Sequence, residues 1–172
     1  PLREYETGKF VFMATSNGTV KKVELEAFSR PRSSGLIAIE LDEGNWLVGV
    51  DITDGEQDIM LFTSEGKAVR FKEENVRAMG RTARGVRGVN LSDGAKLISL
   101  IVPQPGHQVL TASVHGYGKR TAVEDFPTKG RGGKGIIAMR CSERNGALLG
   151  AVQVSETDEI MLISDQGTLV RT

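Results

Sequence analysis

The chain has 172 residues, of which 39% are hydrophobic and 26% are charged, a composition typical of a folded globular protein rather than a disordered one. Its single cysteine, Cys141, excludes an internal disulfide, and with two histidines the chain has too few ligands for a Cys/His zinc site. No apolar run approaches the roughly 18 residues of a membrane helix, and no basic and apolar leader opens the sequence. We therefore expect a cytoplasmic protein with no membrane association.

The net charge of zero, from 22 basic and 22 acidic residues, conceals a segregated distribution. Residues 40–58 hold seven acids and no base, whereas residues 67–96 hold eight bases and three acids. Residues 119–144 hold seven bases and three acids. A nucleic-acid-binding protein is often basic overall, so the net charge argues against that function while the distribution does not.

The expected elements recur along the chain with a period of about 50 residues. The first is an apolar run, a polar turn that ends in glycine, and a cation four residues later. The alternation of apolar and polar residues and the Asn-Gly type of turn predict a β-hairpin at each copy. The copies read "FVFMATSNGTVKK", "DIMLFTSEGKAVR", "QVLTASVHGYGKR" and "EIMLISDQGTLVR", with glycines at Gly18, Gly66, Gly116 and Gly167.

Two further elements follow each hairpin. The second contains Gly35, Gly85 and Gly135 in "RSSGLIAIEL", "TARGVRGVNL" and "GGKGIIAMRC". The third is a glycine turn followed by a strand-like run, as in "WLVGVDI", "KLISLIV" and "ALLGAVQV". No segment has sustained helical periodicity, although "EENVRAM" could form one turn.

Four short strands in each period of about 50 residues predict an all-β, propeller-like fold of four-stranded repeats. Three full blades are expected at residues 9–57, 58–107 and 108–158, and part of a fourth at residues 159–172. Residues 1–8 would be the end of an earlier repeat. The chain is therefore interpreted as a fragment of one longer domain.

The glycines Gly130, Gly132 and Gly135 have the spacing of the dinucleotide-binding motif G-x-G-x-x-G. That motif needs a strand before it and a helix after it, but here a proline-containing loop precedes and the β-like run "IIAM" follows. A P-loop is excluded because Lys134 is followed by glycine. Backbone N–H groups and cations on such a loop can instead bind the phosphates of a polymer.

Cations recur on these glycine-rich loops and after the hairpin turns, and a row of equally spaced phosphate-binding loops suits duplex DNA. A lone charged strand face is usually only solvated, and a hairpin cation can also protect an edge strand. Arg87 departs from the pattern, since its equivalents are Ile37 and Ile137. The candidate DNA-binding residues are Lys21, Lys22, Arg30, Arg32, Arg70, Arg81, Arg84, Arg87, Lys119, Arg120, Lys129, Arg131, Lys134 and Arg171.

Along essentially its whole length, the sequence resembles the C-terminal domain of bacterial DNA gyrase A, most clearly in "VRAMGRTARGVRGVNL", "HGYGKRTAVEDFPTK" and "ERNGALLGAVQV". The resemblance implies a six-bladed β-pinwheel whose neighbouring repeats exchange strands. It implies that double-stranded DNA is bent and wrapped around a basic rim, which makes supercoiling negative. The protein partners implied are the remainder of gyrase A and, in the holoenzyme, gyrase B.

The resemblance places catalysis outside this chain, since Tyr5 and Tyr117 match no catalytic tyrosine. No cofactor is expected in the domain, because ATP and Mg²⁺ belong to the holoenzyme. The family's seven-residue box Q-R-R-G-G-[KR]-G agrees with residues 129–135 at five positions and lacks the Gln and one Arg. Residues 129–135 are therefore interpreted as a degenerate copy of the box, which favours DNA contact more than complete wrapping.

Two alternatives remain open at this point. One is the corresponding C-terminal domain of topoisomerase IV. The other is a protein-interaction propeller with a charged rim, although only 5% of residues are aromatic and such surfaces usually offer aromatic anchors. An enzyme is disfavoured, because no paired carboxylates, metal-ligand cluster or nucleophile–base set is apparent.

Overall fold

The computed structural model describes residues 7–30 and 32–172, so Tyr5 and most of the expected remnant at residues 1–8 lie outside the described residues. The fold is all-β, as predicted, and the helices among these described residues are three short 3₁₀ turns. One of these turns falls in "EENVRAM". None of the helices in the described part of the chain is long or apolar enough to cross a membrane.

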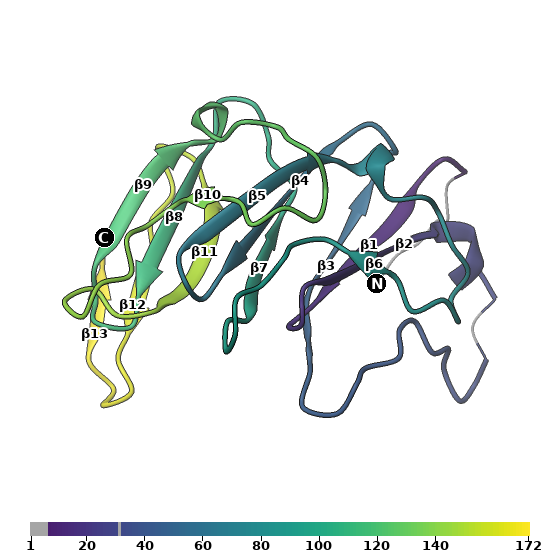
Figure 1. Ribbon diagram of the computed structural model, residues 1–172, viewed down its shortest axis with the longest axis horizontal. Helices are drawn as coiled ribbons and strands as arrows, with labels where there is room; N and C mark the ends of the chain where they lie inside the picture. Colours follow the sequence, from purple (N-terminus) through teal and green to yellow (C-terminus); the bar gives the residue numbers. More distant parts are fainter. Residues whose placement is uncertain (1–6, 31) are drawn as a thin grey trace.

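The strands form three antiparallel sheets and one separate hairpin, which lie side by side along the long axis of the molecule (Figure 1). The strands are β1 (Phe10–Thr15), β2 (Thr19–Glu24), β3 (Leu47–Thr53), β4 (Asp58–Thr63), β5 (Lys67–Lys72), β6 (Val86–Arg87), β7 (Leu97–Ile101), β8 (Gln108–Ser113), β9 (Gly118–Ala122), β10 (Ile136–Ile137), β11 (Leu148–Val154), β12 (Met161–Ile163) and β13 (Leu169–Arg171), and the 3₁₀ turns are η1 (Leu25–Phe28), η2 (Glu73–Asn75) and η3 (Val123–Asp125).

Successive repeats exchange a strand. The first sheet has the order β3-β1-β2-β6, in which β6 comes from the second repeat. The second has the order β10-β5-β4-β7, in which β10 comes from the third repeat. The third sheet, β11-β8-β9, and the hairpin β12-β13 have no exchanged strand among the described residues. Four strands per full sheet were expected from the sequence, and the structure assigns the fourth to the neighbouring repeat.

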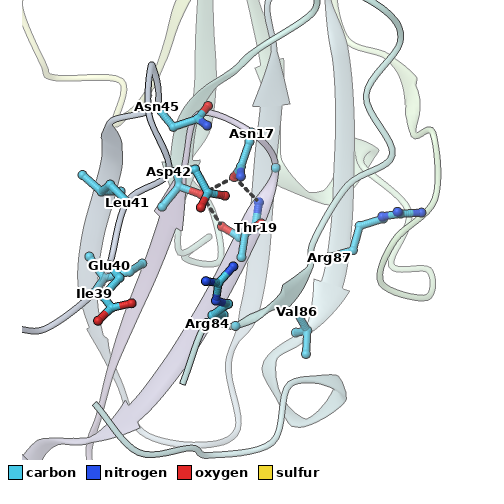
Figure 2. Close-up of a pocket in the computed structure, with 13 residues that line it drawn as sticks. Asn17, Thr19, Ile39, Glu40, Leu41, Asp42, Asn45, Arg84, Val86 and Arg87 are labelled. Carbon is cyan, nitrogen blue, oxygen red and sulfur yellow. Dashed lines mark hydrogen bonds between the residues drawn. The ribbon is translucent and has the colours of Figure 1, made fainter. Parts of the chain in front are cut away.

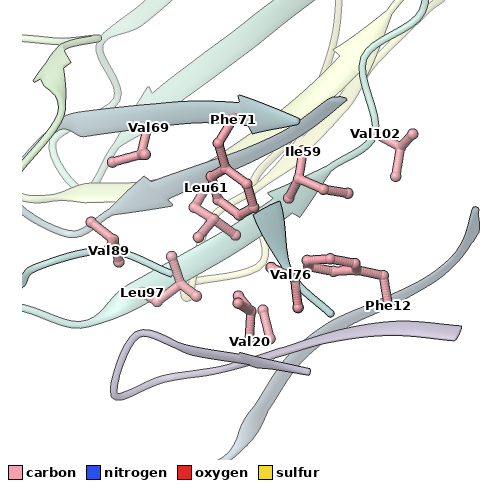
Figure 3. Close-up of a cluster of buried hydrophobic side chains, with 11 residues drawn as sticks. Phe12, Val20, Ile59, Leu61, Val69, Phe71, Val76, Val89, Leu97 and Val102 are labelled. Atoms are coloured by element: carbon pink, nitrogen blue, oxygen red, sulfur yellow. The ribbon is translucent and has the colours of Figure 1, made fainter. Parts of the chain in front are cut away.

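The core consists of two layers between sheets, because β4 is buried on both faces. Side chains alternate along a strand, so Ile59 and Leu61 face the first sheet while Met60 and Phe62 face the third. The first layer, shown in Figure 3, contains Phe12, Ala14, Val20, Ile59, Leu61, Val69, Phe71, Val76, Val89, Leu97 and Val102. The second contains Met60, Phe62, Ala68, Ile101, Val109, Val123, Phe126, Ala138, Met139, Leu148 and Ala151.

The same backbone hydrogen bonds join each repeat to the next. Gly88 N donates to Gly18 O at 2.8 Å, and fifty residues later Ala138 N donates to Gly66 O at 2.8 Å. The contact that joins the first repeat to the second is thus repeated between the second and the third.

Candidate functional site

The glycine-rich loops of successive repeats touch one another. Arg131 Nη1 donates to Arg87 O at 2.7 Å, and Arg81 Nη1 donates to Ile37 O at 3.5 Å, which is the same contact fifty residues earlier. Backbone contacts reinforce the second junction, where Gly132 N donates to Gly88 O at 2.9 Å. We call the two loops at residues 81–87 and 129–135 the basic edge.

Glycine is required in the basic edge because two backbones approach closely there. Gly85 has a φ of +95°, and a Cβ at this position would lie 2.5 Å from Val20 O on β2. Gly135, with a φ of +84°, meets Ala68 O on β5 in the same way. Gly135 is followed by the strand β10, whereas a dinucleotide site needs a helix at that point. The glycine spacing therefore reflects the packing of one repeat on the next.

Eight of the candidate cations are exposed to solvent and make no side-chain hydrogen bond or ion pair with the described residues. Those of the basic edge project from a backbone that the glycines hold against the preceding repeat. Exposed guanidinium and ammonium groups on such a backbone are free to meet an anionic ligand. The eight unengaged candidates are Arg30, Arg32, Arg84, Arg87, Lys119, Arg120, Lys129 and Lys134.

The structure does not place Lys21 and Lys22 at the surface, contrary to the expectation for phosphate contacts. Both residues are buried in β2, because the following repeat covers this strand. Lys21 Nζ donates to Ala38 O at 3.0 Å and to Arg81 O, so its ammonium group connects two loops. Burial lowers the pKa of Lys21, an effect that Glu40 opposes.

Arg70 is also engaged inside the protein. Its Nε donates to Asp58 Oδ2 at 2.8 Å, and its Nη1 donates to Val123 O at 2.8 Å. Its side chain is only 18% exposed. Arg171 pairs with Glu159 at the equivalent position of the last hairpin, but that pair is exposed.

Acidic residues lie closer to the basic edge than their separation in the sequence suggested. A cleft of about 520 Å³ separates residues 39–45 from β6 and the loop before it. In Figure 2, Arg84 lies across this cleft from Glu40 and Asp42, whereas Arg87 points away from it. A polyanion that reaches Arg84 therefore meets repulsion from two carboxylates. The sequence carried no signal for this arrangement, because Arg84 is more than 40 positions away from Glu40 and Asp42 along the chain.

A profile of the family described as DNA gyrase C-terminal domain, beta-propeller, matches residues 9–54, 57–104, 107–155 and 158–172. The chain belongs to this family. Among its relatives, DNA gyrase A of Pseudomonas aeruginosa is 62% identical over 166 residues, which are 96% of this chain and 18% of that protein. DNA gyrase A of Escherichia coli K12 is 56% identical over 172 residues, which are all of this chain and 20% of that protein. The chain thus spans about a fifth of the length of these relatives.

Two solved structures share the fold of this chain. A crystal structure of the C-terminal domain of DNA topoisomerase IV matches with a TM-score of 0.92 and 28% identity, covering all of this chain and 54% of that one. A structure of a DNA gyrase A C-terminal domain matches with a TM-score of 0.85, covering 99% of this chain and 57% of that one. At 24% identity, the second match supports the fold alone. Within residues 7–30 and 32–172 of this gyrase-type domain, no group of three His, Cys, Asp or Glu residues is placed to hold a metal.

Proposed function

We propose that this chain binds and bends duplex DNA, without sequence preference, as a non-catalytic module of DNA gyrase A. The observation that carries the proposal is the basic edge, where the loops of successive repeats touch and expose cations. Exposed backbone and Lys or Arg side chains at regular intervals match the regular phosphates of a duplex.

Affinity would come from neutralised phosphates and released counterions. Bending a duplex of 20–30 base pairs costs on the order of 1–6 kcal/mol. Several contacts must therefore act together, which the junctions between loops allow because they hold Arg84, Arg87, Lys129 and Lys134 on one connected backbone.

In the complete enzyme, the bent segment would be delivered to catalytic parts that lie outside this chain. ATP and Mg²⁺ would act there, with the remainder of gyrase A and with gyrase B as protein partners and the bacterial nucleoid as the location. The same role in topoisomerase IV is the second candidate, supported by the TM-score of 0.92 to that enzyme's C-terminal domain at 28% identity. The identities of 62% and 56% to gyrase A favour gyrase over it.

The test is the affinity for random-sequence duplex DNA of about 40 base pairs across a salt series, with the variant Arg84→Glu combined with Lys134→Glu. We expect weaker binding and a smaller slope of log affinity against log salt, by roughly 0.9 for each lost phosphate contact. The matched control is Arg144→Glu, because Arg144 packs on Tyr117 outside the basic edge. Equal losses in the control and in the double variant would contradict the proposal.

A further inference from the structure

The cation four residues after the hairpin glycine makes the same inter-repeat contact twice. Lys22 Nζ donates to Glu73 O at 3.1 Å, and Arg70 Nη1 donates to Val123 O at 2.8 Å. Glu73 and Val123 are the first residues of η2 and η3, fifty positions apart. Each cation therefore binds the 3₁₀ turn of the following repeat.

The main-chain carbonyl groups of Lys22 and Arg70 also accept hydrogen bonds from the following repeat. Lys22 O accepts from Met79 N at 2.9 Å, and Arg70 O accepts from Lys129 N at 2.7 Å. Met79 and Lys129 lie where the chain leaves the 3₁₀ turn and enters the basic edge. One residue thus fixes both the turn and the beginning of the DNA-binding loop.

The two contacts neutralise their charge differently. Lys22 lies 3.8 Å from Glu73 Oε1, and this buried carboxylate also accepts from Thr53 Oγ1 at 2.8 Å. Arg70 instead pairs within its own hairpin with Asp58, which also accepts from Thr128 Oγ1 at 2.9 Å. Lys22 and Arg70 thus bind the same 3₁₀ turn position, although their charges are neutralised by carboxylates at unrelated positions. The shared part of the arrangement is the contact between repeats, which indicates that this position serves to join them.

The third hairpin carries an arginine at the same position, Arg120, with different surroundings. Arg120 is exposed, and the position of Asp58 is taken by Gln108. In the described part of the chain, Gln108 Oε1 is buried and without a hydrogen-bond partner.

We propose that Lys22 and Arg70 are latches that set the angle between successive repeats, and hence the curvature of the basic edge, rather than phosphate contacts. This inference rests on the proposed DNA-binding function. A single loop binds phosphates through exposed cations such as Arg84, and this binding does not depend on the angle between repeats. Bending a long duplex requires several loops to remain on one curve, and the latches provide that alignment.

The experiment uses the full-length protein with Asp58→Asn, Arg70→Met and the control Arg84→Met. Affinity is measured for a duplex of about 15 base pairs and for one of about 140 base pairs, and bending of the long duplex is measured by end-to-end energy transfer. Asp58→Asn is informative because it weakens the latch while it removes a negative charge, and loss of that charge alone would strengthen the binding of a polyanion. It is also nearly isosteric, so it tests the latch even if Arg70→Met fails to fold.

We expect Asp58→Asn and Arg70→Met to bind the short duplex within about two-fold of wild type, and to lose roughly ten-fold or more in long-duplex affinity together with its bending. Tighter long-duplex binding by Asp58→Asn would overturn the proposal. A salt slope on the short duplex reduced by roughly 0.9 in Arg70→Met would also overturn it, since that is the mark of a lost phosphate contact.

Hydrogen exchange at residues 123–129 distinguishes failure of the latch from failure of the DNA-binding function. Faster exchange in Asp58→Asn and Arg70→Met, with wild-type exchange in Arg84→Met, supports the latch whatever the DNA result. Unchanged exchange in both latch variants overturns it. Absence of DNA binding by the wild-type protein, with accelerated exchange in the variants, would overturn only the proposed function.

Discussion

Replacing Gly85 by alanine tests whether glycine in the basic edge serves the junction between repeats. A Cβ at Gly85 would lie 2.5 Å from Val20 O, well inside ordinary van der Waals contact, so β6 must move away from β2 by about 1 Å. Gly35 is the matched control, because it occupies the same repeat position with a φ of +80°, and no atom of the described residues lies within 4 Å of an added Cβ.

The magnitudes separate the two variants. Alanine in the left-handed region costs about 1–2 kcal/mol, while the lower entropy of the unfolded chain returns about 0.4–1 kcal/mol. Gly35→Ala should therefore lower the free energy of unfolding by about 0.5–1 kcal/mol. Gly85→Ala adds an overpacking cost of about 1–3 kcal/mol, so its total is about 1.5–4 kcal/mol.

Urea unfolding of the 172-residue chain, followed by circular dichroism, measures both values. Gly135→Ala serves as a replicate, since its Cβ would meet Ala68 O. Similar free-energy losses in the Gly35 and Gly85 variants would refute the close-approach argument and leave φ as the only reason for glycine.

The same contacts lead to three further predictions. Because burial lowers the pKa of Lys21, the unfolded chain binds more protons than the native chain in the alkaline range below 10.5. The free energy of unfolding should therefore rise with pH in this range in wild type relative to Lys21→Met. Equal slopes of the unfolding free energy against pH in the two proteins, measured by urea unfolding, would contradict this. Glu40→Gln combined with Asp42→Asn should strengthen DNA binding at low salt and less so at high salt, measured by fluorescence anisotropy; unchanged affinity would mean that Arg84 does not meet DNA. Phe62→Ala should cost about 3–5 kcal/mol in thermal unfolding, because Phe62 is fully buried and packs edge-on against Phe126 at 5.8 Å; a loss below about 1 kcal/mol would show that the second core layer is loosely packed.

The hairpins and the class of fold could be predicted because their determinants are local. Gly18 and Gly66 both have positive φ, as the turn chemistry requires, and alternation along residues 67–72 fixes a strand. The exchanged strands β6 and β10 are different, because two residues are too few to carry a periodicity. Only the family resemblance indicated the exchange, since it depends on a neighbour about fifty residues away.

The residues of the site were predicted by type and position but not by direction. Arg70 lies on the polar side of an alternating strand, which is solvent-exposed in an isolated hairpin. In the folded chain, the 3₁₀ turn of the next repeat covers that side and offers carbonyl groups. Lys21 is covered in the same way. Periodicity describes one strand, whereas the exposure and the hydrogen-bond partners of a cation depend on which groups of the following repeat cover it.

This division of the cations has a measurable consequence for the whole surface. If all the candidate residues contacted phosphates, log affinity would fall with log salt with a slope of roughly −13. Six of them are already engaged, by main-chain carbonyl groups of other loops or turns or by the exposed Glu159 carboxylate. The eight unengaged candidates alone, four of which lie in the basic edge, give a slope of roughly −7. Salt titration of a duplex long enough to reach all eight distinguishes the two values. A slope near −13 would mean that DNA binding breaks the contacts between repeats, and would contradict both the latch and the role of Arg81 and Arg131 in joining the loops.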